Sequence, residues 1–150
     1  MPDQRLEKLA QILIHYSLEI KPGDQLEIRT TPLGQDLALM AYKEAIKAGG
    51  YVTNNLSLQG GEELFHKYAS DDQLDYVSPV RKLITETFDA MLVIGAEYNT
   101  RSLSAIDPLR LSRSRKATTE LTKIFLDRSA NLELRWCYTE FPTYASAQEA

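Results

Sequence analysis

The fold is decided by residues 25–58, QLEIRTTPLGQDLALMAYKEAIKAGGYVTNNLSL. Apolar and polar residues alternate over its first six positions, which predicts a β-strand. The apolar spacing then changes to steps of three and four, which predicts a helix over residues 35–48. Its packed face should comprise Leu37, Met40, Ala41, Glu44, Ala45 and Ala48. Gly49-Gly50 ends this helix, and residues 51–58 return to an extended pattern.

A strand, a helix and a strand in this order form a βαβ unit, in which the strands are parallel and the crossover is right-handed. Parallel strands need cover on both faces, so the rest of the chain should supply helices and further strands. The continuous apolar run at residues 90–94 and the alternating residues 132–136 predict two more strands. We therefore predict an α/β fold for residues 1–150, a single domain with a doubly wound, parallel four-stranded sheet in the order 2-1-3-4, flanked by helices.

Capping signals predict where the other helices begin. Asp3, Ser70, Ser78-Pro79 and Asp107-Pro108 are typical of helix starts, and Gly60-Gly61 opens a helix over residues 62–69. The first helix should bury Leu6, Leu9, Ala10, Leu13 and Tyr16, and the helix that begins after Ser78 should bury Leu83 and Ile84. The helix over 62–69 should gather Leu64, Phe65 and Tyr68 on one side.

The predicted helix over residues 107–128 is apolar on one face only in its second half. We expect that half to pack on the sheet. The first half should project into water or towards something absent from this chain. It contains the basic residues Arg110, Arg113, Arg115 and Lys116, which we interpret as a solvated face because the net charge of the chain is −4.

The composition excludes several classes of partner. An acidic chain with a sequence pI near 5.2 is a poor ligand for nucleic acid or an anionic membrane. The N-terminus lacks a signal-peptide pattern, and no apolar run is long enough for a membrane span. The single cysteine, Cys137, cannot form an internal disulfide, so we expect a reducing, cytoplasmic location.

Motifs for chemistry are absent from the sequence. The turn after the first strand has neither GxGxxG nor GxxxxGK[ST], which disfavours a nucleotide site. The two histidines, His15 and His66, lie on separate helices without a metal-binding motif. Cys137 has no histidine near it in sequence, so it is interpreted as a small buried thiol. We therefore assign no catalytic, cofactor-binding or metal-binding residue.

Two features nevertheless indicate surfaces that could bind something. In doubly wound sheets, ligands lie beyond the carboxyl ends of the strands, here between residues 30–34 and residues 95–101. At the end of the chain, aromatic residues gather where no later element can cover them: Trp136, Tyr138, Phe141 and Tyr144. Exposed aromatic clusters often mark interfaces, so we expect the chain to be the front part of a larger protein.

Several separated segments resemble one family: RLEKLAQILIHYSLEIKPGDQLEIRTTPL, KAGGYV, LDYVSPVRKLITETFDAMLVIGAEYNTRSLSAIDP and ELRWCYTEFPTYASAQEA. Together they are similar to the N-terminal domain of the thermophilic-type dinuclear metallo-aminopeptidases, which include aminopeptidases T and S and the bacterial PepS proteins. The resemblance covers nearly the whole chain in order. The RWC segment followed by Pro142-Thr143 is among its more specific parts.

The resemblance implies a role without chemistry of its own. In the family, two divalent metal ions of the zinc or cobalt type, the catalytic glutamate and a tyrosine belong to a C-terminal catalytic domain, so none of these residues transfers to this chain. The N-terminal domain supports that domain and helps to close a chamber in a homodimer that hydrolyses peptides. The surface facing the other domain is predicted to include Asn99, Thr100, Arg101, Trp136, Tyr138, Phe141, Pro142 and Thr143.

Three hypotheses therefore remain from the sequence. The first is an inactive scaffold domain of a metal-dependent aminopeptidase that releases N-terminal amino acids. The second is a small ligand-binding domain that uses the strand-end crevice. The third is a dimerisation module that acts through the aromatic end of the chain.

Overall fold

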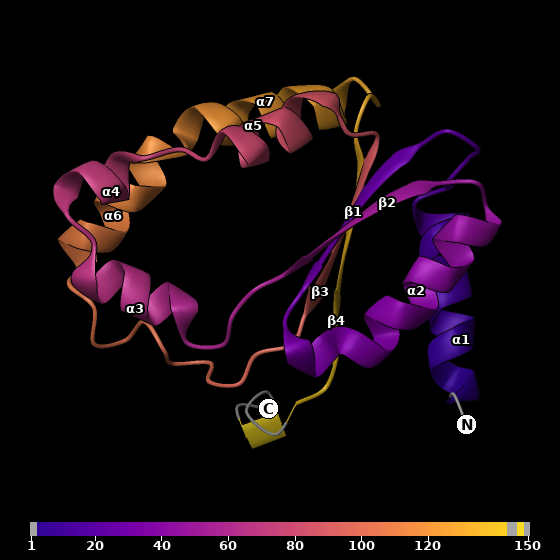
Figure 1. Cartoon of the computed structure of the whole chain (residues 1–150), viewed down its shortest axis with the longest axis horizontal. Helices are drawn as coiled ribbons and strands as arrows, with labels where there is room; N and C mark the ends of the chain where they lie inside the picture. Colours follow the sequence, from indigo (N-terminus) through magenta and orange to yellow (C-terminus); the bar gives the residue numbers. More distant parts are fainter. Residues whose placement is uncertain (1–2, 144–146, 149–150) are drawn as a thin grey trace.

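A four-stranded parallel sheet forms the centre of the molecule in a computed structural model that describes residues 3–143 and 147–148 (Figure 1). The strands are β1 (Gln25–Thr30), β2 (Tyr51–Leu56), β3 (Ala90–Gly95) and β4 (Arg135–Glu140). Their order is β2-β1-β3-β4, and every neighbouring pair is parallel. The predicted α/β class and the predicted strand order are both confirmed.

Helices α1 (Gln4–Gln11) and α2 (Gln35–Lys47) cover one face of the sheet (Figure 1). The main core lies between these helices and the strands, and its fully buried side chains include Leu26, Leu37 and Leu92. The predicted face of α2 is confirmed, since its central members are buried and Met40 and Ala48 are partly buried. The short 3₁₀ turn η2 (Pro32–Gly34) joins β1 to α2.

The chain after α1 continues as a π-helix, η1 (Ile12–Ser17), and this changes which side chains face the core. The amide of Leu18 donates to the carbonyl of Leu13, five residues back, at 3.0 Å. Such wide turns shift the helix face, because each later side chain is displaced around the axis. Ile14 and Leu18 are consequently fully buried, whereas Tyr16 is exposed. The prediction that Tyr16 belongs to the buried stripe is wrong for this reason.

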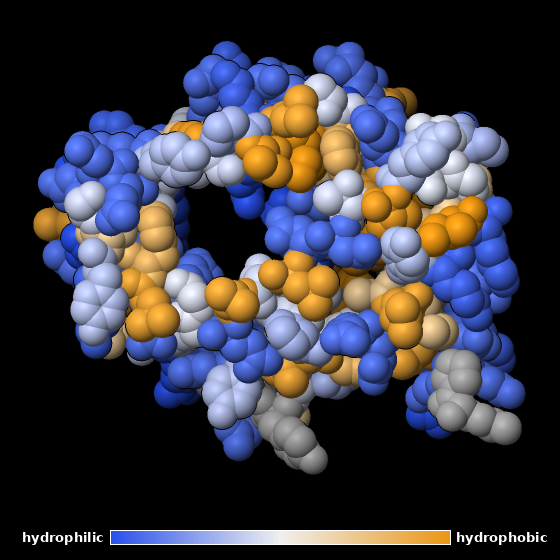
Figure 2. Space-filling view, viewed as in Figure 1, coloured by the Kyte–Doolittle hydropathy of each residue, from blue (hydrophilic) through white to orange (hydrophobic). Residues whose placement is uncertain are grey.

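On the second face of the sheet, α5 (Pro79–Thr87) and α7 (Thr119–Ala130) pack around Ile84, Met91 and Leu134 and leave part of that face exposed. Farther from the sheet, three helices form an arm: α3 (Gly61–Tyr68), α4 (Asp71–Asp75) and α6 (Pro108–Ala117). The space-filling view shows the molecule hollowed between this arm and the sheet (Figure 2).

The predicted helix over 107–128 is two helices, α6 and α7, which meet at Thr118. The first half leaves the sheet, as predicted, and it packs on the other two helices of the arm. Arg110 Nε donates to the carbonyl of His66 at 2.7 Å, and Arg113 forms a two-pronged ion pair with Asp75, with its Nε and Nη2 at 2.8 and 2.7 Å from the two carboxylate oxygens. Two of the four basic residues, Arg110 and Arg113, thus hold α6 against α3 and α4, whereas Arg115 and Lys116 are exposed, as predicted for a solvated face.

Two further expectations are corrected, one on Leu83 and one on the start of β4. Leu83 is exposed and only Ile84 of that pair is buried, because α5 packs on the sheet through a narrow stripe. The apolar residues that the sequence places on one side of α3 are exposed, because α3 lies in the arm away from the core, and the buried residue of this helix is His66. Strand β4 begins at Arg135, since Leu132 has a left-handed backbone with φ 59° and is exposed.

No helix within the described ranges is long and apolar enough to cross a bilayer. Tyr144, which the sequence groups with the aromatic end of the chain, lies outside the described residues.

Glu44 is a buried carboxylate on α2 and predicts acid sensitivity. His15 Nε2 lies 3.0 Å from Glu44 Oε2, and Lys47 Nζ lies 3.4 Å from Oε1. The hydrogen bond to His15 is the largest cause that lowers the pKa of Glu44 below its ordinary value of 4.5. A carboxyl whose pKa is lowered in the folded state stabilises the protein above its unfolded pKa, and this contribution disappears as the pH falls through the folded value.

We therefore expect Glu44→Gln to destabilise the protein at neutral pH, with a difference from wild type that shrinks as the pH falls from about 5 to about 3. Urea unfolding at several pH values measures this difference. Glu120→Gln, which changes an exposed carboxylate on α7, serves as the matched control. A Glu44→Gln difference that is constant across this pH range would contradict the assignment.

Candidate functional site

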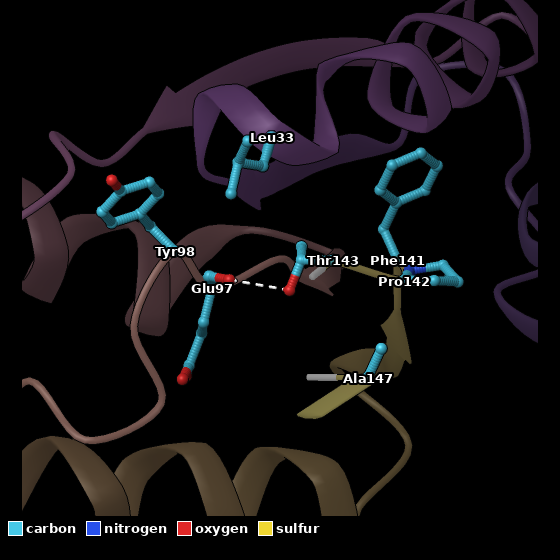
Figure 3. A pocket seen from close by; sticks show the side chains of 7 residues that line it. All are labelled: Leu33, Glu97, Tyr98, Phe141, Pro142, Thr143 and Ala147. Carbon is cyan, nitrogen blue, oxygen red and sulfur yellow. Dashed lines mark hydrogen bonds between the residues drawn. The ribbon is translucent and has the colours of Figure 1, made fainter. Parts of the chain in front are cut away.

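An apolar crevice of about 490 Å³ lies at the carboxyl ends of the strands (Figure 3). Three connections meet there: the β1–α2 turn, the loop after β3 and the segment after β4. The lining residues are Leu33, Glu97, Tyr98, Phe141, Pro142, Thr143 and Ala147. The crevice therefore occupies the position, between residues 30–34 and residues 95–101, that the strand-end rule predicts.

Hydrogen bonds fix the first two of these connections to each other. Thr30 Oγ1 donates to the carbonyl of Ile94 at 2.9 Å, and this bond is buried. Thr31 Oγ1 donates to the carbonyl of Ala96. Because β1 and β3 are neighbours and both end here, two successive threonines reach the backbone of the adjacent strand end. The wall formed by Leu33 is thereby held against the loop that contains Tyr98.

The third connection is tied to the same loop. The amide of Phe141 donates to the carbonyl of Gly95 at 2.7 Å, which extends the β3–β4 pairing by one bond. Thr143 Oγ1 donates to the carbonyl of Glu97 at 2.8 Å, as the dashed line in Figure 3 shows. The segment after β4 therefore forms one wall of the crevice, and its position depends on backbone contacts with the β3 loop.

Gly34 closes the base of the β1–α2 turn because there is no room for a larger residue. Its φ of −92° is accessible to any residue, so the requirement is one of space. A Cβ atom at this position would overlap Thr30 Oγ1 and would lie 3.2 Å from the Cβ of Ala96. Thr30 cannot easily move aside, since its hydroxyl is bonded to the Ile94 carbonyl.

We expect Gly34→Ala to lower the free energy of unfolding by about 1 to 3 kcal/mol, as overpacking does in tight sites. Gly61→Ala is the matched control, because a Cβ there meets only the Leu58 Cβ at an ordinary 3.4 Å. Urea unfolding midpoints measure both effects. Equal urea midpoints for Gly34→Ala and wild type would contradict this prediction, because they would mean that the turn makes room for the added methyl group without loss of stability.

The crevice offers apolar contact rather than chemistry. Leu33, Tyr98 and Phe141 form its walls, and Glu97 provides a single carboxylate. Among the described residues, no group of three or more His, Cys, Asp or Glu is placed to hold a metal ion. The residues of this crevice therefore do not fit the two-metal centre that the family resemblance implies, and we derive no reaction step from it.

The eight residues predicted to face another domain fall in separate places. Phe141, Pro142 and Thr143 line the crevice. Asn99 lines an adjoining hollow of about 820 Å³, which shares Glu97 and Tyr98 with the crevice and extends to the β2–α3 connection. Thr100 and Arg101 are exposed on the same loop, where the amide of Arg101 donates to Asn99 Oδ1 at 3.0 Å.

Trp136 and Tyr138 lie apart from this group, on the second face of the sheet. The Trp136 ring packs against Phe125 of α7, with ring centroids 5.7 Å apart. Tyr138 Oη donates to Glu140 at 3.1 Å, and burial is the main cause that raises the pKa of Tyr138. Alternation along β4 separates these two aromatic residues from the crevice, which the sequence pattern alone did not reveal.

Cys137 alternates to the opposite face and packs against the main core. Burial raises the pKa of the Cys137 thiol, which favours the less nucleophilic protonated form. Sequence reasoning did not name Leu33, Glu97 and Tyr98 individually. The signal that could have found them is their position in the two connections that follow β1 and β3.

Comparison with known proteins identifies the family. The model of the thermophilic metalloprotease family (M29) matches residues 2–150. The fold is similar to that of wild-type AmpT from Thermus thermophilus, with a TM-score of 0.73 and 18% sequence identity. The similarity covers 93% of this chain and 36% of the AmpT chain. A search of curated protein sequences gives no match. The chain belongs to the thermophilic metalloprotease family, M29.

Proposed function

We propose that this chain is the N-terminal scaffold domain of a metal-dependent aminopeptidase, and that the strand-end crevice receives the catalytic part of that enzyme. The observation that supports this most is the family match over residues 2–150 combined with the span of only 36% of AmpT. A protein of this family needs metal-binding residues, and the resemblance to aminopeptidases T and S assigns them to the C-terminal domain. The residues for metal-assisted hydrolysis therefore belong to the remaining length of the family.

The surface chemistry of the crevice supports this role. Its walls are mainly apolar, and Tyr98 is 73% exposed although it lines a concave site. Apolar surface of this kind is stabilised when another domain covers it. The adjoining hollow at Asn99 extends the same surface towards the arm. We place the interdomain contact on these two hollows, with Phe141, Pro142 and Thr143 at its centre.

The full-length enzyme would activate a water molecule with two divalent ions for attack on the N-terminal peptide bond. The chain of 150 residues is expected to be silent in that reaction. The test is release of p-nitroaniline from leucine p-nitroanilide in the presence of added Zn²⁺ or Co²⁺, with aminopeptidase T as the positive control. Metal-dependent turnover that rises in proportion to the concentration of this chain would overturn the proposal.

Exposure of the crevice can be measured separately from activity. Binding of a hydrophobic fluorescent dye should decrease in Leu33→Ser, which makes one crevice wall polar. Leu109→Ser is the matched control, because Leu109 is 78% exposed on α6 and lies outside the crevice. Absence of dye binding to the wild-type chain would mean that the crevice is not an open apolar surface.

We also propose a homodimer and a cytoplasmic location. A dimer is what the family resemblance implies, and sedimentation should show association that increases with concentration. A monomer at all concentrations would contradict the dimer proposal for this chain. The free thiol of Cys137 suits a reducing compartment.

A second candidate function is favoured by the size of the crevice. Its volume of about 490 Å³ falls within the range of small-molecule sites, roughly 300 to 1,000 Å³. A small ligand-binding domain would bind an apolar molecule there without hydrolysing it. This alternative would be favoured if a small apolar competitor displaces the dye from the wild-type chain and a higher concentration of the chain itself does not.

A further inference from the structure

A second cavity, of about 220 Å³, lies on the other face of the sheet, between the strands and helices α5 and α7. Its walls combine two guanidinium groups, from Arg29 and Arg81, with the aromatic side chains of Phe125 and Trp136. It shares no lining residue with the strand-end crevice. Neither the family resemblance nor the proposed interdomain role assigns a function to this cavity.

Glu27 neutralises one of the two cations at this place. Its side chain is 1% exposed on the central strand β1, and Arg29 Nη2 donates to Glu27 Oε1 at 2.6 Å. The side-chain amide of Asn55 donates a long hydrogen bond to Glu27 Oε2, at 3.5 Å. Arg29 Nε is buried without a hydrogen-bond partner among the described residues. The guanidinium of Arg29 therefore has a donor, Nε, for which the described residues supply no acceptor.

Arg81 is the second cation: it lines the cavity, it is exposed to solvent, and no hydrogen bond or ion pair joins its guanidinium to the described residues. Loss of hydration is the main cause that lowers the pKa of Arg81, repulsion from Arg29 adds to it, and attraction to Glu27 opposes it. Arginine nevertheless stays charged in proteins. The Glu27 carboxylate balances only one guanidinium, so the cluster has a surplus of one positive charge facing the cavity.

The form of the cavity restricts the ligand that would balance this charge. One surplus charge matches a monoanion, and a guanidinium fork fits the planar geometry of a carboxylate. Met91, Phe125 and Trp136 form an apolar part of the wall, which suits a hydrocarbon group next to the charge, and Thr85, Thr118 and Thr122 line the rest of it with Val93 and Leu121. At roughly 30 Å³ of liquid volume per water, the space equals about seven water molecules, so the ligand must be small.

We propose that this cavity binds a small carboxylate with a short apolar group, with the carboxylate on Arg81 and the apolar group against Trp136. The site is formed entirely by the described chain and does not depend on the proposed aminopeptidase role. Arg29 contributes mainly by holding Glu27, and the attraction between Glu27 and Arg81 offsets only part of the positive charge of the cluster.

The single tryptophan of the chain, Trp136, reports on the site directly. Isovalerate added to the 150-residue chain should produce a saturable change in tryptophan fluorescence. Isovaleramide, which has the same shape without the charge, and inorganic phosphate, which has charge without an apolar group, should each bind at least about tenfold more weakly, as loss of a charged hydrogen bond predicts.

Arg81→Met should reduce the affinity for isovalerate by about tenfold or more, and Arg81→Lys should retain part of it because the charge remains without the fork. Arg115→Met, an exposed change on α6 outside the cavity, should bind as wild type. Because the Arg81 guanidinium has no protein partner, Arg81→Met should fold, and its urea midpoint verifies this.

Any of three results would overturn the proposal: no saturable change with isovalerate, equal binding of isovaleramide, or unchanged binding by folded Arg81→Met. Tighter binding of phosphate than of isovalerate would also refute the carboxylate assignment and indicate a simple anion site.

Discussion

Arg29→Met is expected to lower the free energy of unfolding by about 3 kcal/mol, near the lower end of the range for breaking a buried ion pair. Glu27, which is 1% exposed, would lose the Arg29 bond of 2.6 Å and keep only the long bond to Asn55. A carboxylate left in this environment is poorly solvated and unpaired. The charge on the nearby Arg81 offsets part of the loss, which is why the expected effect is not larger.

A second variant separates the ion pair from simple packing. The double variant Glu27→Leu with Arg29→Met replaces both charges by apolar side chains, next to Met91 and Val93 on the adjacent strand. Replacing a whole buried pair by apolar residues is often neutral or stabilising, so the double variant should recover most of the lost stability. Urea unfolding followed by circular dichroism measures both variants.

Arg115→Met provides the baseline for removing an exposed arginine and should stay within about 0.5 kcal/mol of wild type. If Arg29→Met is as stable as this control, Glu27 does not depend on Arg29. If the double variant is less stable than Arg29→Met alone, the lost free energy of unfolding comes from poor packing of the new side chains and not from the unpaired charge of Glu27.

The second large effect is expected from Leu92→Ala, which should lower the free energy of unfolding by about 2 to 5 kcal/mol. Leu92 is fully buried on β3, where the strand lies between β1 and β4 and its side chain faces the core under α1 and α2. Removing its three terminal carbons leaves a cavity, because strands paired on both sides cannot collapse inward easily.

Leu58→Ala is the matched control, since Leu58 is 84% exposed, and it should change stability by no more than about 0.5 kcal/mol. Thermal and urea unfolding measure both variants. A loss below about 1 kcal/mol for Leu92→Ala would mean that the core repacks around the site, contrary to the dense packing that the parallel sheet requires.

Local patterns were sufficient for the architecture. The change from alternating to helical spacing after Pro32, and the double glycine after α2, are interactions between near neighbours in the chain, so they are visible in the sequence. The apolar run of β3 suits a central strand, but the sequence does not fix the strand order, and the structure confirms the order that we predicted. The strand-end crevice followed in turn from where those strands end.

Patterns failed where distant residues decided the outcome. Tyr16 is exposed because a π-helix displaces the face of the first helix. The helix expected over residues 107–128 is divided at Thr118, and Arg110 and Arg113 bond its first part to α3 and α4. The alternation along β1 does not show that Glu27 is buried; packing of α5 and α7 beside this central strand buries it.

The sequence by itself determined the α/β class, the parallel sheet and the family, because these depend on local periodicity and on segments that match along the chain. The sequence did not fix the strand order, and the predicted order is confirmed only by the tertiary structure. Only the tertiary structure decided that Phe141 and Trp136 belong to different hollows, and that Arg81 meets Arg29 at a cavity. Such meetings join residues from separate elements, and their distances depend on how the helices pack, which no spacing in the chain encodes.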